Sequence, residues 1–138
     1  MRRVLVDTGP LVAILSRSDQ HHERCVEALR SLPGPLFSCW PVMTEAAWLL
    51  RKSSGAVQQL LRGLDSGFVE LLPLSSLDAN GLADIMKKYA SLRPQLADAA
   101  LVYLAGRDGI ETIFTLDRRD FSVYRLAKKR PFRILPEG

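Results

Sequence analysis

Short apolar runs alternate with longer amphipathic stretches along the whole chain. Short runs of apolar and β-branched residues are typical of buried strands, and apolar residues that recur every three or four positions are typical of helices. Strands are predicted at 3–6, 36–39, 68–72, 111–115 and 132–135. Helices are predicted at 10–15, 21–32, 41–52, 57–64, 76–89 and 94–106, with a short helix after 117. Gly81 weakens the helix at 76–89, because glycine is a poor helix former.

The order of these elements predicts an α/β fold. Strands that alternate with helices form a mainly parallel sheet covered by helices on both faces, here with four or five strands. Ligands of such folds bind at the carboxyl ends of the strands, near the point where the strand order switches. A length of 138 residues suits one domain, and we find no internal repeat or linker, so a single domain over 1–138 is expected.

Composition narrows the class of protein. Hydrophobic residues make up 47% of the chain, but no apolar run approaches the roughly 20 residues that span a bilayer. The basic start followed by 4–6 imitates a signal peptide, but Asp7 interrupts the apolar stretch, so we expect a cytoplasmic protein without a membrane segment. Cys25 and Cys39 are too few for a disulfide framework or a zinc site.

Positive charge is concentrated near the end of the chain. The formal net charge is only +4, yet basic residues cluster at Arg118, Arg119, Arg125, Lys128, Lys129, Arg130 and Arg133. Such a cluster favours a polyanionic partner, but a solvated helix face has the same composition. The cluster therefore supports a nucleic-acid partner only in combination with other features.

Two acidic residues follow predicted strands. Asp7 ends the first strand and Asp117 comes just after the fourth, so both are expected at the edge of the sheet where ligands bind. Each could instead cap the helix that follows, because Asp is a favoured N-cap residue, and Thr8 could take the same role. Their common edge favours a joint site.

Two further acidic residues lie among apolar ones. Glu45 has Trp48 and Leu49 as helical neighbours, and Leu49 is expected on the inner side of its helix. Asp98 is surrounded by alanines. An unpaired buried carboxylate costs roughly several kcal/mol, so a metal shared by these acids would explain both positions. The alternatives are a salt bridge for Glu45 and stabilisation of the first helical turn for Asp98.

Carboxylates gathered in one pocket require a counter-charge. A close pair of like charges repels by roughly 3 kcal/mol at an effective dielectric constant of about 20 and a separation of about 5 Å. Mg²⁺ and Mn²⁺ prefer all-oxygen sites and leave positions for water and substrate phosphate. The acids of such a pocket would be Asp7, Glu45, Asp98 and Asp117, a set typical of a metal-dependent phosphodiesterase.

With these acids in place, the sequence resembles the PIN-domain nucleases, and most closely the ribonuclease toxins of the VapC type from bacterial and archaeal toxin-antitoxin pairs. In the last motif a hydroxyl residue precedes the acid and an aromatic residue follows it. The motifs are 4–11 with Asp7, Thr44-Glu45, 96–100 with Asp98, and 115–121 with Asp117. Their order and spacing extend the resemblance over nearly the whole chain.

The resemblance implies roles for individual residues. The metal-binding and catalytic acids would be Asp7, Glu45, Asp98 and Asp117. Thr8 and Thr115 would support the pocket, and Asp120 would either bind metal through water or only cap the last helix. The resemblance also implies Mg²⁺ or Mn²⁺ as cofactor, RNA as substrate, a homodimer, and an antitoxin protein as partner.

The implied activity is that of an endoribonuclease that hydrolyses RNA phosphodiester bonds with the help of the metal. Arg118 and Arg119 could contact the RNA backbone, because Lys and Arg supply most phosphate contacts. His21 and His22 begin a polar helix away from the strand ends, so an ordinary surface role is expected for them.

Two other classes of protein need acids that this sequence does not have next to Asp7. A phosphoaccepting signalling domain needs adjacent acids after the first strand, where Thr8 and Gly9 stand here, and a haloacid-dehalogenase phosphatase needs a second Asp two residues after Asp7. Two alternatives stay open. One is a catalytically inert PIN-like module that binds RNA or protein, and the other is an RNA-processing PIN nuclease that is not a toxin.

Overall fold

A five-stranded, fully parallel sheet runs through the middle of the computed structural model, which describes residues 2–137. The strands lie side by side in the order β3-β2-β1-β4-β5. They are β1 (Val4–Val6), β2 (Leu36–Ser38), β3 (Val69–Leu71), β4 (Thr112–Phe114) and β5 (Arg133–Leu135). The predicted α/β fold with a mainly parallel sheet is confirmed, with five strands.

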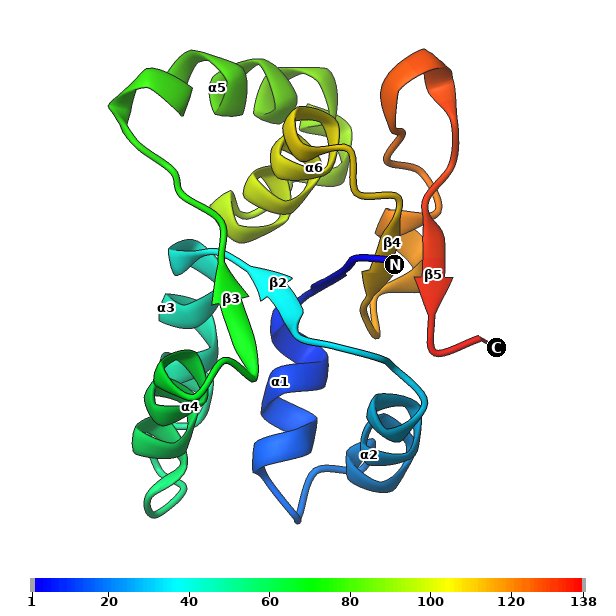
Figure 1. Ribbon diagram of the computed structural model, residues 1–138. Helices are drawn as coiled ribbons and strands as arrows, with labels where there is room; N and C mark the ends of the chain where they lie inside the picture. The colour runs from blue at the N-terminus through cyan, green and yellow to red at the C-terminus, as the bar shows by residue number, and fades with distance from the viewer. Residues whose placement is uncertain (1, 138) are drawn as a thin grey trace.

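Helices cover both faces of this sheet. In Figure 1, α1 to α4 lie on one side of the sheet, and α5 and α6 lie on the other. This arrangement follows from right-handed crossovers, because the connections run outward from β1 to β3 and then return across the sheet to β4. The α-helices are α1 (Thr8–Leu15), α2 (His22–Arg30), α3 (Trp40–Leu49), α4 (Ala56–Asp65), α5 (Ala79–Lys88), α6 (Leu96–Asp108) and α7 (Arg118–Phe121).

Three short 3-10 helices complete the described elements: η1 (Ser76–Asp78), η2 (Ala90–Leu92) and η3 (Ala127–Lys129). The helix predicted at 76–89 is therefore divided into η1 and α5. The helix predicted at 94–106 begins later, at Leu96, because Arg93 adopts a left-handed conformation with a φ of 51° and Gln95 is the N-cap. No helix within 2–137 is both long enough and apolar enough to cross a membrane.

The central strands are buried on both faces. Every residue of β1 and β4 is buried, as expected for inner strands of a parallel sheet between two helical layers. On the α6 side, Tyr124 is fully buried between Tyr89 and Phe121, with ring centroids 4.9 Å from each in edge-to-face geometry. These aromatic rings, together with the hydrogen bond from the Arg125 N–H to the Tyr89 hydroxyl, fix the segment after β4 against the end of α5.

Gly81, which the sequence analysis regards as a weak point of its helix, has a packing role. The ring of Tyr103 on α6 lies against α5, and a Cβ added to Gly81 would come within 2.3 Å of that ring. The Tyr103 hydroxyl then donates a 2.6 Å hydrogen bond to Asp78. Only glycine leaves room for this contact between α5 and α6.

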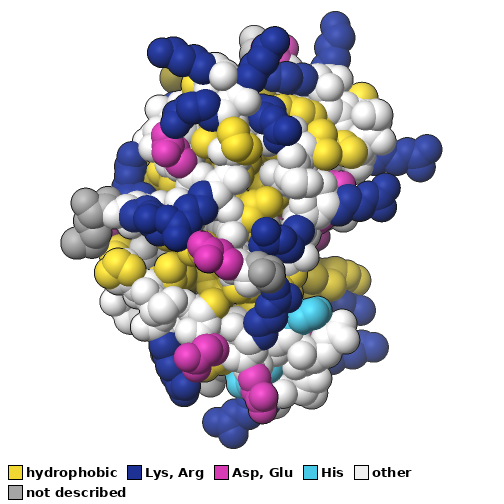
Figure 2. Space-filling model, turned by 90° about the vertical axis from the view of Figure 1, so that its right-hand side faces the viewer, with side chains coloured by type: hydrophobic (Ala, Val, Ile, Leu, Met, Phe, Trp, Pro, Cys, Tyr) yellow, Lys and Arg dark blue, Asp and Glu magenta, His cyan; other side chains and the backbone are white. Residues whose placement is uncertain are grey.

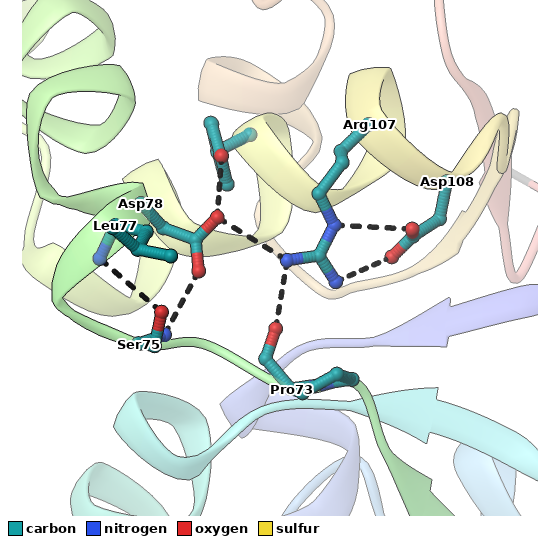
Figure 3. A network of polar contacts seen from close by, with 7 residues as sticks. Pro73, Ser75, Leu77, Asp78, Arg107 and Asp108 are labelled. Carbon is teal, nitrogen blue, oxygen red and sulfur yellow. Dashed lines mark hydrogen bonds and ion pairs between the residues drawn. The ribbon is translucent and has the colours of Figure 1, made fainter.

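Figure 3 shows the polar network around Asp78. The carboxylate accepts a hydrogen bond from the Ser75 N–H, and Arg107 contacts Asp78, both carboxylate oxygens of Asp108 and the carbonyl of Pro73. Because Arg107 is on the last turn of α6, the network ties the connection between β3 and α5 to that helix. The pair α5 and α6 is thereby held as one unit.

A Gly81→Ala substitution should therefore lower the free energy of unfolding by about 1–3 kcal/mol, since overpacking against Tyr103 outweighs the better helix propensity of alanine. Urea denaturation would measure the change. The matched control is Gly106→Ala on α6, where an added Cβ meets nothing within 4 Å and should stabilise by about 0.5–1 kcal/mol. Equal effects at the two positions would contradict the packing role of Gly81.

Candidate active site

Asp7 is held rigidly at the carboxyl end of β1. It is the N-cap of α1, and one carboxylate oxygen, Oδ1, accepts a 2.8 Å hydrogen bond from the Thr8 N–H. The other, Oδ2, accepts a 2.8 Å hydrogen bond from the Thr115 hydroxyl. The side chain is buried, with 7% of the residue exposed. Both the predicted cap and the predicted location at the sheet edge are therefore observed.

Thr115 connects the ends of the two central strands. Besides donating to Asp7, its Oγ1 accepts a 3.0 Å hydrogen bond from the Asp117 N–H. Asp117 in turn caps α7 by accepting a 3.0 Å hydrogen bond from the Asp120 N–H. The connection crosses the boundary between β1 and β4, which is where the strand order switches.

Glu45 reaches the same edge from α3. Its Oε1 accepts a 2.6 Å hydrogen bond from the Thr8 hydroxyl, so the residue after Asp7 also orients this second acid. The expectation that Leu49 lies on the inner side of this helix is wrong, because Leu49 is 53% exposed, and the neighbouring Trp48 is 63% exposed. Glu45 is half-buried at the border of an exposed apolar surface.

Asp98 is held at the first turn of α6. Its Oδ2 accepts a 3.1 Å hydrogen bond from the Gln95 N–H, so the alternative of first-turn stabilisation is correct. This role uses one oxygen, and the residue nevertheless faces the same cavity as Asp7. For Asp7, Asp98 and Asp117 alike, capping a helix and facing the cavity are compatible roles, because each of the two carboxylate oxygens can accept more than one contact.

The acids meet in one cavity of about 490 Å³, which we call the acidic pocket. Its acidic lining residues are Asp7, Glu45, Asp98, Asp117 and Asp120. Thr8 also lines it, whereas Thr115 is buried and acts through its hydrogen bonds. The lining further includes Gly9, Leu49, Arg93, Gln95 and Leu116, which the sequence analysis did not place in the site.

Other sequence-predicted residues lie outside the acidic pocket. Arg118 and Arg119 are exposed and do not line it, and the Arg118 guanidinium donates to the Pro136 carbonyl at 2.7 Å. His22 forms a 2.7 Å hydrogen bond between its Nδ1 and the Ala13 carbonyl. His21 and His22 are both half-buried rather than on the open surface, and neither lines the acidic pocket.

A larger hollow of about 630 Å³ lies elsewhere, between α2 and β5. Its two acids, Glu27 and Glu137, are exposed, and Glu137 forms an ion pair with Arg133. The smaller acidic pocket is the better candidate for catalysis, because it collects carboxylates from the ends of several elements at the switch in strand order.

Burial and mutual repulsion disturb the ionisation of the acidic pocket. Burial raises the pKa of Asp7 from 3.8 to about 7, against the hydrogen bonds from Thr115 and Thr8, and the charges of Asp98 and Glu45 add to the rise. Burial likewise raises the pKa of Asp98, and the charge of Glu45 contributes. Strongly shifted carboxyl groups in a cavity are typical of functional sites.

A divalent cation matches this donor set. The acidic pocket offers carboxylate oxygens and hydroxyls, the ligands of hard cations such as Mg²⁺ and Mn²⁺. Within 2–137, no group of three or more His, Cys, Asp or Glu side chains is placed so that it could hold a metal ion by itself. Mg²⁺ would need only one or two direct carboxylate ligands and would keep several water ligands.

A buried hydroxyl group adds to the polarity near the acids. Among the side chains of 2–137, the Tyr124 hydroxyl is the one buried polar group without a hydrogen-bond partner. Burial raises the pKa of Tyr124, and the charges of Asp98 and Asp120 raise it further, so the hydroxyl stays protonated.

Known proteins resemble this chain over most of its length. Residues 4–129 match the model of the PIN domain. The chain is 33% identical over 135 residues to ribonuclease VapC26 of Mycobacterium tuberculosis (strain ATCC 25618 / H37Rv), and the match covers 96% of this chain and 100% of that protein.

Two solved structures share the fold. The crystal structure of VapC20 from Mycobacterium tuberculosis, a toxin that cleaves the sarcin-ricin loop, superposes with a TM-score of 0.80 at 19% identity, over 93% of this chain and 99% of that one. DNA-bound VapBC from Salmonella typhimurium gives a TM-score of 0.59 at 18% identity, over 97% of each chain. The chain described here therefore belongs to the PIN-domain family, and its similarity within that family is to the VapC type.

Proposed function

We propose that this protein is a metal-dependent endoribonuclease that hydrolyses RNA phosphodiester bonds and serves as the toxin of a toxin-antitoxin pair. The observation that carries the proposal is the common pocket of Asp7, Glu45, Asp98 and Asp117 at the carboxyl ends of the central strands. The relationship to a protein named as a ribonuclease supports the activity, and the VapBC complex supports an antitoxin partner.

Mg²⁺ or Mn²⁺ would be held among the same four acids, by one or two of them directly and by the others through water ligands. When bound, the ion polarises a phosphoryl oxygen, lowers the pKa of a water molecule and stabilises the leaving oxygen. The protein's part is to fix the ligands before substrate arrives. Thr8 and Thr115 do this by hydrogen bonds to Glu45 and Asp7, so neither carboxylate has to be reorganised during the reaction.

The surface charge favours RNA as the substrate. Figure 2 shows Lys and Arg side chains spread over the face that carries β5 and the segment before it. Arg118 and Arg119 belong to the exposed basic residues of this region and would contact the RNA backbone outside the acidic pocket. The protein would act in the cytoplasm, where RNA and the antitoxin are both made.

Two other functions remain to be separated from this one. An inert PIN-like module would bind RNA or protein without cleaving it, and an RNA-processing nuclease would cleave without being a toxin. Induced expression of this chain in bacteria should stop growth, and expression of a small DNA-binding protein encoded directly upstream should restore it. Cleavage without growth arrest would favour the RNA-processing nuclease.

Metal dependence is tested with purified protein and structured RNA. Cleavage should require Mg²⁺ or Mn²⁺ and stop with a chelator, and Asp98→Asn should reduce the rate by about 100-fold or more, because charge stabilisation at a phosphoryl group is worth several kcal/mol. Mn²⁺ should also raise the melting temperature of the wild type more than that of the variant. If Mn²⁺ produces neither cleavage nor a thermal shift, the inert module is the better description.

Asp7→Asn should abolish cleavage yet stabilise the metal-free protein at neutral pH. The raised pKa of Asp7 means that the folded state binds a proton more tightly than the unfolded state between pH 3.8 and about 7. Stability contributed by the neutral form is then lost as the pH rises through this window, at about 1.4 kcal/mol per pH unit. Asn stays neutral: its Oδ1 can still accept from the Thr8 N–H, and its Nδ2 would donate to the Thr115 hydroxyl oxygen instead of accepting from it.

The measurement is the melting temperature of wild type and Asp7→Asn from pH 4 to pH 8 with a chelator present. The advantage of the variant should grow with pH and level off above about 7. Asp65→Asn, at an exposed position at the end of α4, is the matched control and should follow the wild type. Parallel profiles for wild type and Asp7→Asn would contradict the raised pKa.

The homodimer implied by the family resemblance would form through the exposed apolar surface of α3 and α6. Trp40, Trp48, Leu49 and Leu96 are 59%, 63%, 53% and 53% exposed there. Trp40, Trp48 and Leu96 line a hollow of about 500 Å³, and Leu49 follows Trp48 directly on α3. A contiguous apolar surface of this kind is typical of a protein interface.

Trp48→Glu should therefore convert the dimer to a monomer, as measured by sedimentation velocity. The matched control is Leu77→Glu, because Leu77 is also exposed, at 93%, but lies on η1. A wild-type protein that is monomeric at high concentration, or a Trp48→Glu variant with unchanged mass, would exclude this surface as the interface.

A further inference from the structure

Arg93 is the one basic residue that lines the acidic pocket within 2–137. It lies between η2 and α6, a short distance along the chain from Asp98. The other charged lining residues are all carboxylates. A single cationic side chain beside several acids can serve as their counter-ion, or it can bind an anion that the acids alone would repel.

The backbone of Arg93 is constrained. Its φ and ψ are 51° and 55°, in the left-handed region, where a residue with a side chain is less stable than glycine by about 1 kcal/mol. The Arg93 N–H bonds to the Ala90 carbonyl at 3.0 Å, and Pro94 follows directly. The turn therefore fixes the direction in which the side chain leaves, although glycine would suit the conformation better. Strained positions of this kind are often kept for function.

The guanidinium of Arg93 is not engaged as a structural counter-ion. Across 2–137 it forms no ion pair, whereas Arg107, Arg130 and Arg133 each pair with a carboxylate. The residue is exposed at the mouth of the pocket. An arginine that borders carboxylates without pairing with them is available to bind an anion.

We infer that Arg93 binds the RNA phosphate at the acidic pocket and stabilises the charge that develops there during hydrolysis. This inference rests on the proposed function. The planar guanidinium matches two phosphate oxygens, and arginine stays protonated throughout. In the reaction a water oxygen forms the new bond to phosphorus, the bond to the leaving ribose oxygen breaks, and a proton from that water ends on the leaving oxygen. Arg93 donates hydrogen bonds to the non-bridging oxygens and transfers no proton.

The best test is Arg93→Gly, because glycine removes the side chain and also relaxes the left-handed backbone. The variant should fold at least as stably as the wild type. Its kcat at saturating Mn²⁺ should fall at least tenfold, because arginines that stabilise phosphoryl transfer have larger effects than this. The kcat of Arg93→Lys should lie between that of the wild type and that of Arg93→Gly. The control is Arg62→Ala, since Arg62 is exposed on α4 outside the acidic pocket.

A binding measurement gives an independent readout. Fluorescence anisotropy with RNA and a chelator, which prevents cleavage, should give weaker binding for Arg93→Gly, with a salt dependence reduced by about one phosphate contact. The rise in melting temperature with Mn²⁺ should persist, because removing a cation from the acidic pocket does not weaken binding of another. Arg62→Ala should match the wild type in both measurements.

Two results would overturn the inference. One is unchanged kcat and unchanged salt dependence in Arg93→Gly. The other is loss of folding or of the Mn²⁺ thermal shift in that variant, which would assign Arg93 a structural role. Failure of the proposed function has a different signature, namely a wild-type protein that cleaves no RNA, and the anisotropy comparison still tests the phosphate contact in that case.

Discussion

Repulsion between like charges is the constraint on which the acidic pocket depends. Neutral donors hold the carboxylates in place: Thr8 and Thr115 through their hydroxyls, and backbone N–H groups at the starts of α1, α6 and α7. Such donors fix an acid without cancelling its charge. The fold thus keeps a concentrated negative potential that a cation can relieve. Burial raises the pKa of Asp7, and the charges of Asp98 and Glu45 add to that rise.

Helix starts and the acidic pocket are made by the same residues. Asp7 and Asp117 are N-caps, and Asp98 accepts a hydrogen bond from the N–H of Gln95, the N-cap of α6. Because the carboxyl ends of parallel strands lead into helices at one edge of the sheet, capping acids collect there without any further structure. This explains why a small α/β sheet with three-residue strands can present a polar pocket beside a well-packed core.

Local sequence was sufficient for the elements that carry the pocket. Asp7 and Asp117 follow apolar runs directly, so their common edge could be deduced from strand order alone. Glu45 was assigned for a reason that is partly wrong, since Trp48 and Leu49 face solvent and a short-range pattern does not distinguish a core face from an exposed apolar surface. The bond from Thr8 to Glu45 joins residues 37 positions apart and has no local signature.

The place of Arg93 in the acidic pocket is not predicted by the sequence. The Arg93-Pro94 pair stands shortly before Asp98, but the left-handed conformation of Arg93 depends on tertiary structure.

The bond between Thr115 and Asp7 spans 108 positions along the chain. On the ribosome, β1 emerges first, and Thr115 emerges 108 residues after Asp7. Until then Asp7 lacks its hydroxyl donor and Asp117 is absent, so no shorter nascent chain can assemble the acidic pocket. A nuclease built in this order cannot complete its site before Asp117 and Asp120 have been made.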